Sequence, residues 1–318
     1  MPSRHSALSY EHAGRIEAQL KAEVADLLAK AEAADGADIA DGMSIPEELA
    51  PEELAPEELA RRETRLAEIA KARATIEARA RERYARELAE HEAKLAARAA
   101  QAEATGKKPG GKPPQTPAEG PLPSDQVNLT DEESRIMPVP GGGFEQCYNA
   151  QAAVAAESML VVAANVVQAP NDKQQLEPML DKIDRLPEEL GEVENLLADN
   201  GYFSASNVTA CEAAGVEPLI AMGRQPHHPT LAERFAEAPP APENPTPVEA
   251  MAHRLKTPAG KKLYGLRKQL PEPVFGIIKS VLGFRQFLLR GLDKVRGEWS
   301  LVTMSWNLKR MFVLCAAR

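Results

Sequence analysis

The sequence predicts an α/β protein that is preceded by a long helical hairpin, on the basis of three observations. Short apolar runs alternate with helical segments after residue 126, as in proteins whose helices cover a sheet. Residues 1–105 carry helical periodicity, and a stretch rich in Pro, Gly and Lys at 106–125 separates the two parts. The predicted organisation is therefore a hairpin at 1–105, a linker at 106–125 and an α/β domain at 126–318.

The N-terminal part predicts two helices that pair with each other. Residues 9–34 place Ile16, Leu20 and Val24 on one face, the spacing of an amphipathic helix. Residues 57–103 form a longer, charged pattern with a thin apolar stripe: Leu66, Ile69, Ile76, Leu88 and Leu95. A stripe this narrow suits a single partner helix, so we expect a coiled-coil hairpin.

Two segments predict irregular structure. PEELA occurs three times between Pro46 and Ala60, and proline is tolerated only in the first turn of a helix, so two of the three copies should interrupt regular helix. The linker GKKPGGKPPQTPAEGPLPSD at 106–125 has the composition of a flexible spacer.

The part after residue 126 predicts strands and helices in alternation. The runs at 147–157 and 159–169 predict two adjacent strands joined by a tight connection. Residues 171–186 predict a helix that Asn171 or Asp172 caps. The remaining predicted elements are, in order, a short strand in LLAD, a helix from Ser204 or Ser206 to Gly215, a strand in EPLIAM, an irregular proline-dense segment at 224–248, and helices from Glu249 onward.

The distribution of charge predicts a polyanionic partner. The net charge is −9, but residues 251–318 hold 14 Lys and Arg against three acidic residues, a local net charge of +11. A basic C-terminal surface of this kind suits nucleic acid. The alternative is a basic tail that only balances the acidic remainder of the chain.

Several function classes find no support. Cys147, Cys211 and Cys315 are far apart and form no CxxC pair, which argues against a disulfide framework or zinc site and fits a reducing cytosol. No apolar run reaches the roughly 18 residues of a membrane span. No phosphate-binding glycine loop, nucleophile elbow or metal-binding histidine motif indicates a small-molecule enzyme.

The stretch LLADNGYFS places one carboxylate, Asp199, at the end of a short apolar strand. The C-terminal tips of strands in α/β sheets are common positions for catalytic and metal-binding side chains. Asp-Asn-Gly is also an ordinary turn sequence, so Asp199 alone leaves both interpretations open.

A second carboxylate lies in YGLRKQLPEPVFGIIK, residues 264–279. Pro271 and Pro273 predict a helix start that leaves Glu272 in the first turn, with Lys279 two turns later on the same face. The alternative is an amphipathic helix whose apolar residues face the core and whose polar residues are only solvated.

These motifs resemble the DDE transposases of bacterial insertion sequences. The resemblance rests on YNAQAAV, NDKQQLEPM, LADNGYFS and PEPVFGIIK, and on a signature of the form Y-x2-R-x3-E-x6-K. Four residues rather than three separate Arg267 from Glu272 in this chain. The resemblance implies an RNase H-like mixed sheet with flanking helices at 126–318, and identifies the helical hairpin as an insertion.

The resemblance also implies a mechanism. Three carboxylates would hold two Mg2+ ions that drive phosphodiester hydrolysis and strand transfer, with Asp199 as the second carboxylate and Glu272 as the third. Tyr264, Arg267 and Lys279 would contact DNA near the cut, and Arg285, Arg290, Lys294 and Arg296 would extend that contact. The implied partners are transposon ends and either the full-length transposase or a second copy of this chain, at the nucleoid in the bacterial cytoplasm.

The first carboxylate should lie on a strand before the hairpin. The chain starts at MPSRHSALSYEHAG, so we expect that the first strand, its aspartate and an N-terminal DNA-recognition domain are absent. Ala155 stands where relatives often carry an aspartate, and Asp131 is the remaining candidate. The resulting hypothesis is a truncated, inactive transposase remnant. Its rivals are a non-catalytic DNA-binding or inhibitory protein and a coiled-coil scaffold.

Overall fold

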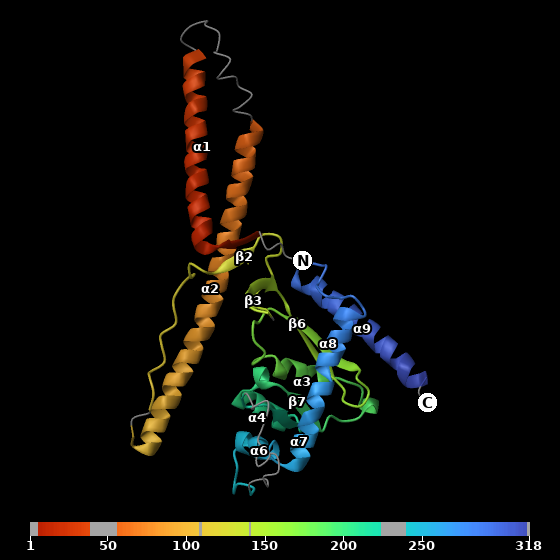
Figure 1. The fold of residues 1–318 in the computed structure, drawn as a ribbon. Helices are drawn as coiled ribbons and strands as arrows, with labels where there is room; N and C mark the ends of the chain where they lie inside the picture. Colours follow the sequence, from red (N-terminus) through yellow and green to blue (C-terminus); the bar gives the residue numbers. More distant parts are fainter. Residues whose placement is uncertain (1–5, 39–55, 108–109, 140, 224–239, 317–318) are drawn as a thin grey trace. The chain divides into compact units, whose positions relative to one another are not determined.

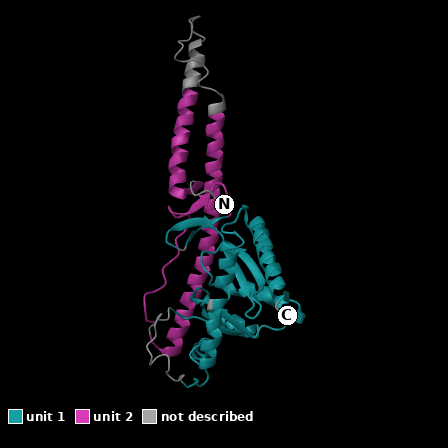
Figure 2. Ribbon diagram, turned by 45° about the vertical axis from the view of Figure 1, so that its right-hand side comes forward, with its two compact units in different colours: residues 1, 134–318 teal, residues 2–133 magenta. Residues whose placement is uncertain are grey.

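A computed structural model describes residues 6–38, 56–107, 110–139, 141–223 and 240–316 (Figure 1). The chain divides into two compact units, residues 2–133 and residues 134–318, which Figure 2 colours separately. Across these described residues, no helix is both long enough and apolar enough to span a membrane.

The first unit is a pair of helices with a short sheet at its base. Helix α1 spans Tyr10–Asp38 and α2 spans Pro56–Thr105, while β1 (Ala7–Ser9) pairs antiparallel with β2 (Gln126–Asn128). Ile69 and Ile76 from the predicted stripe of α2 are buried, together with Leu8, Ala13 and Val127. Leu95 at the far end of the stripe is exposed. Buried packing of α2 is therefore concentrated near the small sheet. The PEELA copies at Pro46 and Pro51 lie outside the described residues.

The segment after α2 runs back alongside that helix (Figure 1). Arg98 donates a hydrogen bond to the Gly111 carbonyl at 3.4 Å. Arg83 forms an ion pair with Asp125 at 2.8 Å and donates to the Gly120 carbonyl. These contacts attach the described part of the predicted linker to side chains of α2.

The second unit is α/β, as predicted. Its strands are β3 (Arg135–Pro138), β4 (Phe144–Cys147), β5 (Asn149–Val154), β6 (Val161–Val167), β7 (Asn195–Ala198) and β8 (Glu217–Ile220). Its helices are α3 (Leu176–Asp184), α4 (Ala205–Ala213), α6 (Pro247–Arg254), α7 (Pro258–Gly265), α8 (Pro271–Ser280) and α9 (Leu292–Ala316), with 3-10 helices η3 (Glu188–Leu190), η4 (Asn200–Tyr202) and η5 (Leu266–Gln269).

The strands of this unit pair two by two. β3 with β4 and β5 with β6 are antiparallel, and β7 with β8 is parallel. The predicted neighbours at 147–157 and 159–169 are thus β5 and β6, and LLAD and EPLIAM supply β7 and β8. Because the described strands form separate two-stranded sheets, the single RNase H-like sheet stays a prediction.

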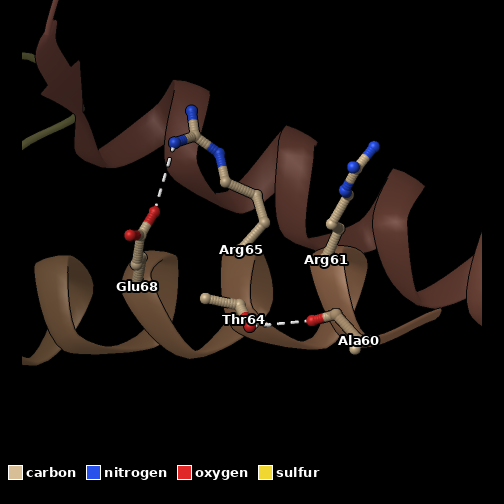
Figure 3. Close-up of a pocket in the computed structure, with 5 residues that line it drawn as sticks. All are labelled: Ala60, Arg61, Thr64, Arg65 and Glu68. Atoms are coloured by element: carbon tan, nitrogen blue, oxygen red, sulfur yellow. Dashed lines mark hydrogen bonds and ion pairs between the residues drawn. The ribbon is translucent and has the colours of Figure 1, made fainter. Parts of the chain in front are cut away.

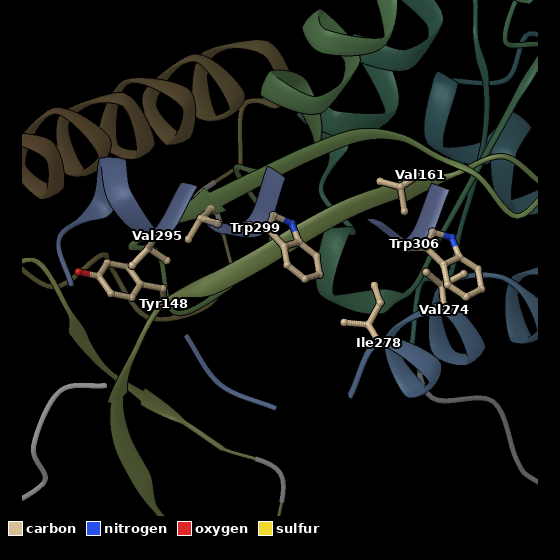
Figure 4. Packing of buried hydrophobic residues seen from close by; sticks show 8 residues of the cluster. Tyr148, Val161, Val274, Ile278, Val295, Trp299 and Trp306 are labelled. Carbon is tan, nitrogen blue, oxygen red and sulfur yellow. The ribbon is translucent and has the colours of Figure 1, made fainter. Parts of the chain in front are cut away.

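A first hydrophobic cluster joins α8 and α9 to the β5–β6 hairpin (Figure 4). Trp299 and Trp306 of α9 are 3% and 4% exposed. Their indole N–H groups donate to the carbonyls of Gln151 and Met159 at 3.0 and 2.9 Å. Each large ring is therefore buried with its polar atom satisfied, so the two tryptophans are core residues.

A second cluster joins β7 and β8 to α3, α4 and α6. It buries Leu180, Ala198, Val208, Ile220 and Met251. The N-cap prediction for α4 is confirmed, because the Ser204 hydroxyl accepts from the Asn207 N–H at 3.1 Å.

Two predicted boundaries differ from the structure. Helix α3 begins at Leu176 without a side-chain cap, so the prediction that Asn171 or Asp172 caps it is wrong. Asp172 instead accepts hydrogen bonds from β5, described below. In the proline-dense segment, residues 224–239 lie outside the described residues, and a capping box of Thr246 and Glu249 starts α6.

Candidate functional site

Asp199 stands at the end of β7, one residue after the buried Ala198. Its side chain accepts from the Gly201 N–H at 2.8 Å and caps η4. The parallel pairing of β7 with β8 and the packing behind both strands fix the backbone at this point. The carboxylate itself is 53% exposed, so it can accept a further ligand.

Glu272 lies on α8, the helix that packs into the first hydrophobic cluster. It lies in the first turn of α8, whose Val274 and Ile278 are buried against the β5–β6 hairpin. Pro271 begins the helix, as its fixed φ and missing N–H favour. The Glu272 carboxylate is 65% exposed.

Arg267 of η5 brings the two carboxylates together. One terminal nitrogen lies 3.9 Å from Asp199 Oδ2 and the other lies 3.7 Å from Glu272 Oε1. The side chain is only 20% exposed, and its Nε is buried without a hydrogen-bond partner. Acidic residues that are 73 positions apart thus flank one guanidinium group.

Tyr264 of α7 contacts both the end of β7 and Arg267. Its hydroxyl donates to the Ala198 carbonyl at 3.3 Å, and its ring lies 5.9 Å from the Arg267 guanidinium carbon. Burial raises the pKa of the Tyr264 phenol, which keeps the phenol protonated as a donor. The Tyr-x2-Arg spacing therefore lets Tyr264 bind the last residue of β7, Ala198, and lets Arg267 contact the Asp199 carboxylate that follows it.

A polar network from β5 borders the same turn, and the sequence prediction missed it. The amide side chains of Asn149 and Gln151 donate to Asp172 Oδ1 at 2.8 and 2.7 Å. The Tyr202 hydroxyl donates to Gln151 Oε1. Burial, followed by the charges of Asp172 and Asp199, raises the pKa of Tyr202.

Gly201 is the point where this network meets Asp199. A Cβ on Gly201 would lie 3.0 Å from Asp199 Oδ1 and 3.3 Å from Asp172 Oδ2. Asp172 is thus a further carboxylate beside the turn. The available signal was the pair Asn149 and Gln151, which share one face of a strand and are polar where the other strand positions are mostly apolar.

The basic residues differ in how much of each is available to a partner. Lys279 is exposed in the last turn of α8, and Arg285, Arg290 and Lys294 are exposed on either side of the start of α9. Arg296 donates from Nε to the Val166 carbonyl at 3.1 Å and pairs with Asp293 at 3.7 Å. Part of Arg296 is therefore used to hold α9 on β6.

The donor set fits one hydrated divalent ion. Mg2+ prefers oxygen ligands and is commonly held by one or two carboxylates, waters and substrate phosphates, which matches Asp199 and Glu272. Within the described ranges, no three His, Cys, Asp or Glu residues form a group that could hold a metal ion. Asp172, the further carboxylate beside this turn, already accepts hydrogen bonds from Asn149 and Gln151. Asp131, the remaining candidate for a first carboxylate, is buried in the unit of residues 2–133.

An open groove on the outer part of α2 offers no comparable chemistry (Figure 3). Its volume is about 470 Å³ and its lining is Ala60, Arg61, Thr64, Arg65 and Glu68. Arg65 already pairs with Glu68 at 3.3 Å. Nothing in this lining resembles the paired carboxylates of the second unit.

Comparison with protein families identifies the second unit. A family model described as "Transposase DDE domain" matches residues 126–308. Comparison with curated proteins and comparison with solved structures give no significant match. The matched segment is more than half of the chain and contains Asp199, Arg267 and Glu272, so the chain belongs to the transposase DDE domain family.

Proposed function

We propose that this transposase-family chain binds DNA through the basic residues of α8, α9 and the segment between them, and binds a divalent metal at Asp199 and Glu272. The proposal rests on one observation above all, the convergence of Asp199 and Glu272 on Arg267. DNA of transposon ends is the partner that the family membership favours. With such a partner, the proposed location is the nucleoid in the bacterial cytoplasm.

The chemistry follows from the residues at the site. Asp199 and Glu272 offer exposed carboxylate oxygens to one Mg2+. That ion, when bound, supplies Lewis-acid activation of a phosphodiester and of an attacking water. Lys279 is exposed in the last turn of the helix that carries Glu272, which supports its proposed role in binding a DNA phosphate. Tyr264 and Arg267 contribute first through the contacts that hold Asp199 in place.

We further propose that the chain by itself does not cut DNA. Only two carboxylates converge on Arg267 among the described residues. The two-metal chemistry that the family resemblance implies needs three, so the chain is proposed to be a remnant of a transposase. This predicts no Mg2+- or Mn2+-dependent nicking of DNA that carries terminal repeats. Robust cleavage that disappears in Asp199→Ala would show that the catalytic set is complete.

A non-catalytic DNA-binding or inhibitory protein is the second candidate. The exposure of Arg285, Arg290 and Lys294 supports it. Neutralising phosphates with basic side chains releases counterions, so affinity should fall steeply with salt. The variant Arg285→Glu, Arg290→Glu, Lys294→Glu should weaken binding and flatten this salt dependence in a fluorescence-anisotropy titration. If the variant gives the same titration as the unchanged chain, these three residues do not contribute to DNA binding.

The outer face of α9 supports a second copy of the chain as a protein partner. Leu301, Met304, Leu308 and Met311 are exposed and recur at intervals of three and four residues, the spacing of a coiled-coil seam. Ser305, next to Met304, is uncharged and exposed, so it adds no like-charge repulsion between two copies. Leu301→Glu with Leu308→Glu should convert a dimer into a monomer in sedimentation equilibrium. A monomer in the unchanged chain would refute this interface.

A further inference from the structure

The charges at the site are not balanced by the one cation between them. The carboxylates of Asp199 and Glu272 each contact a different terminal nitrogen of the Arg267 guanidinium. Two negative charges and one positive charge leave the cluster with excess negative charge before any metal binds. Because both carboxylates are more than half exposed, the cluster can take up another cation from solution.

The contacts of Arg267 are loose. Its two carboxylate contacts measure 3.9 and 3.7 Å, longer than the roughly 2.7–2.9 Å of a charge-assisted hydrogen bond. The buried Nε has no hydrogen-bond partner, and the same holds for the Nε of Arg73, so the contacts of the two terminal nitrogens with the carboxylates decide how firmly the guanidinium is held. Arg267 has access to the Tyr264 ring at 5.9 Å, and a cation over an aromatic face retains part of its electrostatic stabilisation.

A matched cluster elsewhere in the chain shows the tight alternative. Arg73 of α2 also lies over a tyrosine ring, that of Tyr10, at 5.0 Å, and also contacts two carboxylates, Glu17 and Glu77. Its contact with Glu17 is a close hydrogen bond, and the Glu17 side chain is only 17% exposed. An arginine, a tyrosine and two carboxylates thus make a cluster that the short Arg73–Glu17 contact closes in one unit, and an open cluster in which both carboxylate contacts are long in the other.

We infer that Arg267 is an internal counter-cation that keeps Asp199 and Glu272 together in the metal-free chain and gives up these contacts when a divalent ion binds between them. The inference rests on the proposed function, because it concerns the same site. It assigns Arg267 a positioning role toward the carboxylates, whereas the family resemblance implied only a DNA contact. The structural consequence is competition: the guanidinium and the metal share the same two oxygen ligands.

If Arg267 competes with the metal, replacing Arg267 should increase the affinity of the chain for a divalent ion. Replacing Arg267 by Gln removes the positive charge while retaining a polar side chain of similar reach, so Mn2+ alone should bind the full chain about tenfold more tightly. Free Mn2+, counted by electron paramagnetic resonance, reports this binding without DNA and without activity. Arg267→Lys keeps a charge but loses the two-pronged guanidinium, so its gain should be smaller. Melting temperatures measured in parallel show that each variant is folded.

The controls separate the site from the rest of the chain. Arg73→Gln removes an arginine from the matched cluster and should leave Mn2+ binding unchanged. Asp199→Asn added to Arg267→Gln should abolish the gain. The inference is overturned if folded Arg267→Gln binds Mn2+ no more tightly than the unchanged chain, or if Arg73→Gln gains equally. If Arg267→Gln does not fold, an Arg267→Lys variant without any gain overturns it. DNA binding by the basic segment is measured separately, so its failure stays distinguishable.

Discussion

Two clusters in this chain each combine an arginine, a tyrosine and two carboxylates, and they differ in how closely these side chains contact one another. In the first unit, Arg73 makes a close hydrogen bond to Glu17 and the Tyr10 hydroxyl donates to Glu77 at 2.9 Å, while Arg73 and Glu77 lie 3.9 Å apart. In the second unit, Arg267, Tyr264, Asp199 and Glu272 stand 3.3–3.9 Å from their neighbours, and both carboxylates face solvent. The residue types differ only in that Asp199 stands where the first cluster has a glutamate.

The difference lies in where the four residues come from. The closed cluster joins two long helices that pack against each other along a shared face, and the Glu17 carboxylate there is only 17% exposed. The open cluster joins the end of β7 to η5 and the first turn of α8. Ends of elements leave side chains partly in water, which suits a site that exchanges one cation for another. An open cluster can bind a ligand, and a closed cluster mainly stabilises the fold.

The largest expected effect tests whether the open cluster binds a metal. In the Arg267→Gln background, Glu272→Gln should lower the affinity for Mn2+ by about 100-fold, because even second-shell changes at metal sites cost 10–100-fold. The change removes a charge while preserving the size of the side chain. Isothermal titration with Mn2+ measures it. An affinity within a few-fold of the parent variant would exclude Glu272 as a ligand.

The next effect tests the closed cluster. Arg73→Gln should destabilise the first unit by about 1 kcal/mol, since a charge-assisted hydrogen bond contributes more but partial exposure screens it. Hydrogen exchange of amides in α1 and α2 monitors this unit, because both tryptophans lie in the second unit. Equal protection in the two proteins would mean that the close contacts of Arg73 add nothing measurable.

Acid should also act on the closed cluster. Hydrogen bonds from Lys21, and then from Arg73, lower the pKa of Glu17. A lowered folded-state pKa contributes stability that is present above the unfolded value, about 4.3, and is lost as the pH falls through the folded value. Exchange protection of α1 should therefore decrease below about pH 4.3, and Glu17→Gln should reduce this dependence. An identical pH profile in the variant would assign the acid sensitivity to other carboxylates.

The smallest effect concerns the tyrosine of the open cluster. Tyr264→Phe removes the hydrogen bond to the Ala198 carbonyl and leaves the ring below Arg267. The loss of free energy of unfolding should be about 0.5 kcal/mol, as for a long, partly buried hydrogen bond. Urea denaturation followed by tryptophan fluorescence of Trp299 and Trp306 reports it. A loss of several kcal/mol would show that Tyr264 is a core residue rather than a support for β7.

Local signals in the sequence were sufficient for the individual elements of the site. The apolar run before Asp199 predicted β7, and the two prolines around Glu272 predicted the start of α8. The Asp172 prediction failed because its partners, Asn149 and Gln151, lie 23 and 21 residues earlier in the chain. A short polar side chain before a helix is normally read as a cap, and only the neighbouring strand changes that role.

The sequence by itself determined the alternation of strands and helices after residue 126, the basic C-terminal segment and the two carboxylates, because each is written in local spacing and charge. Only the tertiary structure decided that Asp199 and Glu272 share Arg267, because two separate hydrophobic clusters must pack before residues 73 positions apart can meet. It also decided that the site is open while its counterpart at Arg73 is closed. Burial and water access depend on the packing of whole elements, and no single stretch of sequence specifies them.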